Sequence, residues 1–432
     1  PMDEYRMLVR EIYDSGQEIE ALDRKTGEML SARAPQLIAA RNRLEELANN
    51  FDVRKMAARM EDKKEDYYIL CGWMAEDDIE MFLDEIKDDE KNFVVVEDDH
   101  DTYFGEPPTK LENPKIFKPF EMFVQMYGLP SHNEMDPTVF VGLTYSFIFG
   151  VMFGDVGQGL LLLIGGFLLY RFKKLDLAAI ISCCGFCSTI FGFLFGSVFG
   201  FEDVIPALWL RPAEAMTALP FVGRLNTVFV TAIALGMGMI LLTMIVNMAV
   251  SFKCRDTEKT WFDTNGLAGF IFYLSLAAVI ILYMTGRPLP ATAVLAVMFV
   301  VPLLLIFLKE PLAALVERRG PELSGGAMFF VEGFFELFEV LLSYFSNTLS
   351  FVRVGAFAVS HAAMMQVVLM LSGAETGHIS IPVIVLGNLF VCGMEGLVVG
   401  IQVLRLEYYE LFSRFYRGTG REFKPFLKKQ TF

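Results

Sequence analysis

Polar and apolar residues follow a helical period along the first part of the chain. Over residues 3–60, apolar side chains recur about every 3.5 residues with charged residues between them. They are Tyr5, Leu8, Ile12, Ile19, Leu22, Met29, Leu37, Ala40, Leu44 and Leu47. This period predicts a cytoplasmic coiled-coil helix over 1–62, kinked or broken at Pro35. A helix of an ordinary bundle is the alternative interpretation.

The apolar stripe of this helix is too narrow to fold alone, so it needs a partner strand. The partner is either another chain or sequence that is missing here. The helical pattern has already begun at residue 3, so we expect the chain to be a fragment that lacks its true N-terminus.

A small α/β lobe is predicted over 63–105. Residues 67–73 and 93–96 are rich in β-formers and predict two strands, with a helix over 75–87 between them. The helix has acidic residues in its first turn, which suits the helix dipole. Residues 106–137 are rich in Pro, Gly and Asn and predict a linker to the next region.

Eight apolar segments follow, each a candidate membrane span. A span needs about 20 apolar residues. The segments are 138–153, 156–171, 177–199, 226–250, 264–284, 290–308, 327–372 and 379–413. We therefore expect a mainly α fold. It is a polytopic membrane helix bundle of about eight spans over 138–413, the last two long and tilted, followed by a C-terminal tail, 414–432.

Two connections carry further expectations. The first two spans share a tight turn, 153–157, in which Asp155 is expected to reach the interface rather than be buried. The connection 201–225 is semi-polar and contains Trp209, so it is expected to lie along the outer interface.

Charge separates the same two regions. The chain has a net charge of −15, yet 54% of its residues are hydrophobic. Residues 1–138 carry a net charge of −16 and residues 139–432 a net charge of +1. An acidic soluble segment argues against a nucleic-acid partner. The six cysteines show no disulfide framework, which argues against a secreted disulfide scaffold.

Lys and Arg residues gather in the connections after the even-numbered spans. The positive-inside rule therefore places these connections in the cytoplasm. An even number of spans then predicts a multi-pass cell-membrane protein whose N-terminal segment and C-terminus are both cytoplasmic.

The two last spans carry polar stripes. In the seventh span, residues spaced by three and four lie on one helical face. They are Glu332, Glu336, Glu339, Ser343, Ser346, Ser350 and Arg353, with Asn347 beside them and Ser360 and His361 near the continuation. In the eighth span, Asn388, Glu395, Gln402 and Arg405 share a face. Charge inside a membrane usually marks an ion path or a pairing partner.

Depth along the two helices suggests two aqueous half-channels. His361 and Glu395 are predicted on the outer side, Arg353 and Arg405 as a barrier, and the stripe from Glu332 to Ser350 on the inner side. Arg does not deprotonate, so Arg353 can block a direct leak and attract a carboxylate but cannot relay a proton. The alternative is an interhelix salt bridge that holds the arginines through Glu395 or another carboxylate. A lone His is also often only hydrogen-bonded inside a bundle, so a direct role of His361 is left open.

Several motifs in order resemble one family. They are 108–111 (PTKL) with 113–115 (NPK), 120–121 (FE), 127–130 (YGLP), 149–157 (FGVMFGDVG), 346–353 (SNTLSFVR) with 360–362 (SHA), and 395–397 (EGL) leading to 404–406 (LRL). Together they resemble the membrane subunit a of the V-type/A-type rotary ATPases (ATP synthases), called subunit I in bacteria and archaea. By this resemblance Arg353 matches the essential arginine that faces the rotor ring and Arg405 the second arginine. His361 and Glu395 match polar residues of the exit path.

The resemblance implies a stator subunit and no cofactor. The implied partners are the rotor ring of small proteolipid subunits, the peripheral stalk subunits, the lipid bilayer and, indirectly, the central-stalk or collar subunit and the ATP-hydrolysing head. The family includes both H⁺ and Na⁺ pumps. The family's soluble domain normally has an earlier first half that supplies the other coiled-coil strand.

Two other classes of protein compete with this interpretation. A secondary transporter predicts internal repeats and broken helices around a midplane site, and no repeat is visible. A non-conducting membrane scaffold predicts that Arg353 has no role in transport. The G-x-x-x-x-G-K-[ST] motif is absent from the sequence, so we do not expect the chain itself to hydrolyse ATP.

Overall fold

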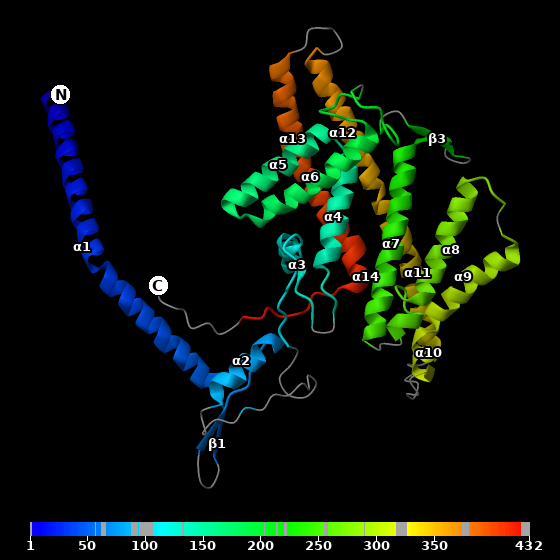
Figure 1. The fold of residues 1–432 in the computed structure, drawn as a ribbon, viewed down its shortest axis with the longest axis horizontal. Helices are drawn as coiled ribbons and strands as arrows, with labels where there is room; N and C mark the ends of the chain where they lie inside the picture. Colours follow the sequence, from blue (N-terminus) through cyan, green and yellow to red (C-terminus); the bar gives the residue numbers. More distant parts are fainter. Residues whose placement is uncertain are drawn as a thin grey trace. The chain divides into compact units, whose positions relative to one another are not determined.

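The computed structural model describes residues 2–56, 58–61, 66–87, 94, 107–131, 134–202, 204–212, 215–219, 223–254, 258–288, 290–316, 326–373 and 380–424. The chain forms two compact units (Figure 1). The arm unit comprises Pro1–Asp99 with Phe423–Phe432, and the membrane unit comprises His100–Glu422. Each is described by itself.

The arm unit begins with one long helix, α1 (Met2–Met56), which continues through Pro35 without a break. The predicted apolar stripe is solvent-exposed at Ile19, Leu22, Leu37 and Leu44. A stripe that stays open on a helix of this length fits the coiled-coil prediction, which nothing in the described residues tests further.

A hairpin follows α1 where the last turns of the coiled-coil helix were predicted. Strand β1 (Ala58–Glu61) pairs antiparallel with β2 (Asp66–Ile69), with Ala58 opposite Ile69. Helix α2 (Glu76–Ile86) comes next, as predicted. The order is therefore β-β-α up to this point, because the strand predicted at 67–73 pairs with a preceding segment. Of the strand predicted at 93–96, only Val94 is described, and it lies outside any strand.

The membrane unit is mainly helical. After a short 3₁₀ turn, Lys118–Phe120, its helices are α3 (Glu121–Tyr127), α4 (Thr138–Met152), α5 (Val156–Lys173), α6 (Asp176–Phe195), α7 (Thr227–Lys253), α8 (Leu267–Met284), α9 (Thr292–Phe307), α10 (Lys309–Val316), α11 (Gly326–Ser350), α12 (Val352–Leu371), α13 (Ile381–Leu406) and α14 (Ser413–Phe415). Two π-helical segments, Glu258–Phe262 and Glu407–Phe412, precede α8 and follow α13.

Within the described residues, six helical stretches are long and apolar enough to cross a membrane. They are Val156–Lys173, Asp176–Phe195, Thr227–Lys253, Glu258–Met284, Met328–Leu371 and Ile381–Phe415. Two shorter apolar helices, α4 and α9, coincide with the remaining predicted spans. The helical membrane bundle is thus confirmed, whereas the count of eight spans stays a prediction.

Helices α5 and α6 pack as a close hairpin (Figure 1). A Cβ on Gly185 of α6 would lie 2.4 Å from the backbone nitrogen of Leu163 in α5. Only glycine permits this approach, as is common where membrane helices touch. Within the apolar helix α6, Cys183, Cys184 and Cys187 form no disulfide, and the thiols of Cys71 and Cys254 are exposed.

The predicted seventh span is interrupted at one residue. Phe351 lies in a turn between α11 and α12, and it is fully buried. Its ring packs against Gly236 of α7, where an added Cβ would be 2.3 Å from the ring carbon Cγ. The interruption of this long span therefore lies two residues before Arg353.

The predicted linker and the C-terminal segment fold together. Phe120, Phe123 and Val124 are buried in the core of the membrane unit. The Tyr416 hydroxyl donates to the Gly128 carbonyl over 2.5 Å, the Gly420 amide to Leu129 over 2.8 Å, and the Thr109 amide to Arg421 over 2.7 Å. We call this pairing of 107–130 with 416–422 the C-terminal clasp. Residues 107–131 are consequently structured rather than a simple connector.

The connection 201–225 contains a second hairpin, β3 (Met216–Leu219) with β4 (Gly223–Asn226). Trp209 stacks on Phe195 at the end of α6, with ring centroids 6.3 Å apart. The predicted placement of this connection along the outer interface stays a prediction.

Candidate functional site

Arg353 lies in the first turn of α12, directly after the interruption at Phe351. The side chain is half-buried. Its Nη2 donates to the Ser350 hydroxyl oxygen over 3.3 Å. Its Nη1 is enclosed and finds no hydrogen-bond partner among the residues that the structure describes. Arg353 can therefore donate hydrogen bonds in addition to the one that Ser350 accepts.

Arg405 and Gln402 lie one turn apart near the end of α13, which packs against α12. Arg405 is exposed and Gln402 is half-buried. Arg405 is close enough to Arg353 for the two positive charges to repel each other. Two like charges on neighbouring helices favour an anion between or beside them.

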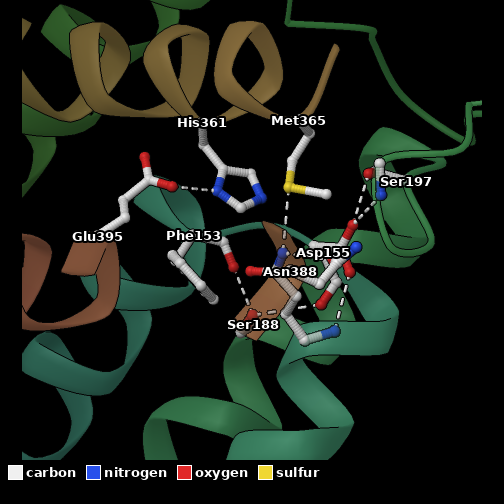
Figure 2. Close-up of polar contacts among 10 residues, drawn as sticks. Phe153, Asp155, Ser188, Ser197, His361, Met365, Asn388 and Glu395 are labelled. Atoms are coloured by element: carbon white, nitrogen blue, oxygen red, sulfur yellow. Dashed lines mark hydrogen bonds and ion pairs between the residues drawn. The ribbon is translucent and has the colours of Figure 1, made fainter. Parts of the chain in front are cut away.

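His361 and Glu395 meet inside the bundle, as Figure 2 shows. His361 Nδ1 and Glu395 Oε2 are 2.6 Å apart, and both side chains are almost completely buried. The ring of Phe153 covers the imidazole with centroids 4.7 Å apart. Glu395 thus pairs with His361, and the alternative in which Glu395 or another carboxylate holds the arginines stays a prediction.

His361 keeps one nitrogen available. Its Nε2 is enclosed and has no partner within the described part of the chain. A small pocket borders the ring and is lined by Gly154, Ser197, Glu202 and Ala358 among others. The imidazole therefore connects a buried carboxylate on one side with a pocket on the other.

The predicted inner stripe lies along α11 and is largely open. Glu332, Glu339, Ser343 and Ser346 are exposed, and the predicted neighbour Asn347 is half-buried. Asn347 donates from Nδ2 to the Ser343 hydroxyl over 3.3 Å. The stripe ends at Ser350, next to Arg353, so it forms one continuous polar face.

Glu336 differs from the rest of the stripe because it pairs with Lys309 of α10. Burial lowers the pKa of Lys309, but the hydrogen bond and the negative charge of Glu336 outweigh burial, so the pKa is raised. Lys309 therefore stays charged. Its ion pair with Glu336 connects α10 to the N-terminal half of α11.

Asp155 is fully buried, so the expectation that it reaches the interface is wrong. Its carboxylate accepts hydrogen bonds from the amides of Gln158, Phe199 and Gly200 and from the Ser197 hydroxyl (Figure 2). Asp155 caps α5, and the segment 197–200 folds over it. The sequence correctly predicted that the chain reverses at this turn, but it did not predict that residues 197–200 cover the Asp155 carboxylate.

A cross-helix amide pair lies next to Asp155. Gln158 of α5 donates from Nε2 to Asn388 Oδ1 of α13 over 2.9 Å and contacts the Met365 sulfur of α12 at 3.1 Å (Figure 2). Asn388 was predicted on the polar face of the eighth span. These contacts tie α5, α12 and α13 together close to the His361–Glu395 pair.

Three buried charged residues beyond the predicted polar faces escaped the sequence analysis: Glu407, Glu410 and Arg414. All are buried, and they lie in or just after the π-helical turn Glu407–Phe412. The Ser350 hydroxyl donates to the Glu410 carboxylate. Arg414 donates to Asn265 and lies over the ring of Tyr344. Their spacing of three and four residues at the end of an apolar run was the available signal.

Within the described residues, no group of three or more His, Cys, Asp or Glu side chains is arranged to hold a metal ion. The site's polar groups instead pair with one another or remain open to a neighbour.

Comparisons with known proteins find relatives of one kind. A family model described as the V-type ATPase 116kDa subunit family matches residues 4–200. The chain is similar to the A-type ATP synthase subunit I of Saccharolobus solfataricus (30% identity, 74% of this chain, 55% of that protein) and of Aeropyrum pernix (31%, 74% and 51%). It is also similar to that of Thermococcus kodakarensis (28%, 84% and 54%). The chain spans about half the length of these curated relatives. On these matches, the chain belongs to the V-type ATPase 116kDa subunit family.

Proposed function

We propose that this chain is the stator membrane subunit of a rotary A/V-type ATPase or ATP synthase, in which it guides H⁺ or Na⁺ past a rotor ring. One observation carries the proposal. A continuous polar face on α11 leads to Arg353, and a buried His361–Glu395 pair lies further along the neighbouring helices. The relatives named A-type ATP synthase subunit I support it.

In this proposal two half-channels meet at Arg353. The inner one follows Glu332, Glu339, Ser343, Ser346 and Asn347. The outer one passes His361 and Glu395, with Gln402 and Arg405 lining the approach. A cation enters by one path, binds a carboxylate of the ring and leaves by the other path when that carboxylate meets Arg353.

Arg353 separates the two paths because a guanidinium stays protonated in proteins. Its exposed neighbour Arg405 adds positive charge at the same face. A ring carboxylate that arrives there is favoured in its charged form, so it releases its cation. A cation travelling alone is repelled, which prevents a short circuit between the paths.

The proposed partners follow from these roles. The rotor ring of small proteolipid subunits faces α11, α12 and α13, and the peripheral stalk subunits bind the arm unit and hold it still. The central-stalk or collar subunit and the ATP-hydrolysing head act indirectly. Hydrolysis or synthesis of ATP belongs to that head, so this chain is a non-catalytic part of the complex.

The test uses membrane vesicles that hold the assembled complex. We expect Arg353→Ala to abolish ATP-driven cation uptake while the subunit still assembles. Arg171→Ala, which removes an exposed arginine at the end of α5, is the matched control and should retain uptake. Normal uptake by the Arg353→Ala complex would contradict the proposal. Measuring ATP hydrolysis with and without Na⁺ distinguishes the two cations.

A further inference from the structure

Glu410 is a buried carboxylate that has no role in the proposed half-channels. It lies in the π-helical turn after α13, and 5% of its surface is exposed. One oxygen, Oε1, accepts the hydrogen bond from the Ser350 hydroxyl. The other, Oε2, is enclosed and has no partner within the described residues. A buried carboxylate is costly unless a positive charge or hydrogen bonds compensate it.

The compensating charge is Arg353, reached through Ser350. The Ser350 hydroxyl has one hydrogen and donates it to Glu410, so its oxygen lone pairs remain free to accept. Arg353 Nη2 donates to that oxygen over 3.3 Å. Both hydrogen bonds therefore run in the same direction, from the Arg353 guanidinium to the Ser350 hydroxyl and from that hydroxyl to the Glu410 carboxylate. A positive group lies at one end of this chain and a negative group at the other.

The π-helical turn brings Glu410 into this position. In a regular α-helix, residues five apart point about 140° away from each other. A π turn has i→i+5 hydrogen bonds and moves such residues toward one face. Arg405 and Glu410 are five apart, and both lie within electrostatic reach of Arg353. The turn thus holds the Glu410 carboxylate next to the Ser350 hydroxyl, which accepts a hydrogen bond from Arg353.

We propose that Glu410 is a positioning residue for Arg353: through Ser350 it holds the guanidinium at the junction of α11 and α12 and offsets part of the positive charge of Arg353 and Arg405. This inference rests on the proposed function. With the carboxylate present, Arg353 keeps one orientation toward the passing ring. Without it, the guanidinium is free to turn, and the barrier between the half-channels weakens.

The experiment compares Glu410→Gln with Glu407→Gln in vesicles that hold the assembled complex. Glu407 lies in the same π turn and is fully buried, but no hydrogen bond or ion pair among the described residues links it to Arg353. We expect Glu410→Gln to lower ATP-driven uptake about tenfold, the effect of losing one charge-assisted contact, and to lower the cations moved per ATP. Glu407→Gln should stay close to the unmodified complex.

The second measurement is the passive cation leak. If Glu410 had only a structural role, its replacement would not increase the leak more than the replacement of Glu407 does. Vesicles without ATP receive an imposed cation gradient, and Glu410→Gln should dissipate it faster than Glu407→Gln. Ser350→Ala removes the same link from the other end and should reproduce both effects. The double variant Ser350→Ala/Glu410→Gln should be no worse than the more impaired single variant, since both remove one chain of contacts.

Each other outcome is decisive. Equal losses in Glu410→Gln and Glu407→Gln, or multiplying losses in the double variant, would overturn the inference. Normal uptake and a normal leak in Glu410→Gln or in Ser350→Ala would also overturn the inference. If Arg353→Ala is inactive in the same experiment, the proposed function still stands. If a Glu410 variant fails to assemble, Ser350→Ala decides alone. Uptake by Arg353→Ala would remove the proposed function itself.

Discussion

At the residue scale, Asp155 holds together two segments that are distant in sequence. Its carboxylate caps α5 and accepts hydrogen bonds from Ser197, Phe199 and Gly200. Gly200 is buried, Ser197 and Phe199 are half-buried, and the three distances are 2.7 to 3.0 Å. Removal of a carboxylate that accepts several hydrogen bonds leaves each donor unpaired.

Replacing Asp155 therefore has a clear expected result. Asp155→Ala should destabilise the detergent-solubilised protein by about 3 kcal/mol or more, because several donors lose a charged acceptor. Thermal unfolding measures the change. Asp176→Ala is the control, since Asp176 is an exposed acidic residue in the first turn of α6. Equal transition temperatures for the two variants would contradict this role of Asp155.

The residue scale also shows where sequence reasoning stopped. The 3.6-residue spacing was enough to place Ser350 and Arg353 on one face, and their contact follows from that spacing. Asp155 could not be placed in the same way, because the segment that encloses it lies more than forty residues further along. Glu410 was hidden in an apolar run, and its partner Ser350 is 60 residues earlier.

At the element scale, the interruption between α11 and α12 depends on a close contact with α7. Phe351 is completely buried, and the backbone at Gly236 approaches its ring. Apolar runs predict that the long span exists, but they do not show where it is interrupted. The interruption follows from packing against α7, which only the folded bundle provides.

A methyl group at this contact should disturb the interruption. We expect Gly236→Ala to destabilise the protein by about 1–3 kcal/mol, because the new Cβ would overlap the Phe351 ring. Gly238→Ala is a matched control on the same helix, since no atom lies within 4 Å of an added Cβ there. Thermal unfolding of both variants in detergent provides the comparison. An unchanged Gly236→Ala protein would show that α7 does not constrain Phe351.

At the scale of the whole molecule, the two ends of the membrane unit are joined. The C-terminal clasp pairs residues near 109–130 with 416–422 through backbone hydrogen bonds and the Tyr416 hydroxyl. The rings of Tyr127, Phe412 and Tyr416 pack together beside it. Composition alone predicted a linker and a tail here, because neither segment has a clear period and each forms its structure only with the other.

Truncation tests the C-terminal clasp. A chain ending after Phe415 should unfold about 5 °C or more below the full chain, because it loses several hydrogen bonds and the Tyr416 ring contacts. A chain ending after Lys424 keeps the clasp and should unfold at the temperature of the full chain. If both truncated chains behave alike, the clasp does not stabilise the membrane unit.

The distribution of thiols has a practical consequence for spectroscopy. Cys71 is an exposed thiol in the arm unit and Cys254 an exposed thiol at the end of α7, whereas Cys184 is buried within α6. A water-soluble spin label should react first at Cys71 and Cys254, so the native protein already carries one accessible attachment point on each unit. The distance distribution between two such labels would be narrow for a rigid lever and broad for a flexible tether. It would thereby show how rigidly the arm unit is connected to the membrane unit.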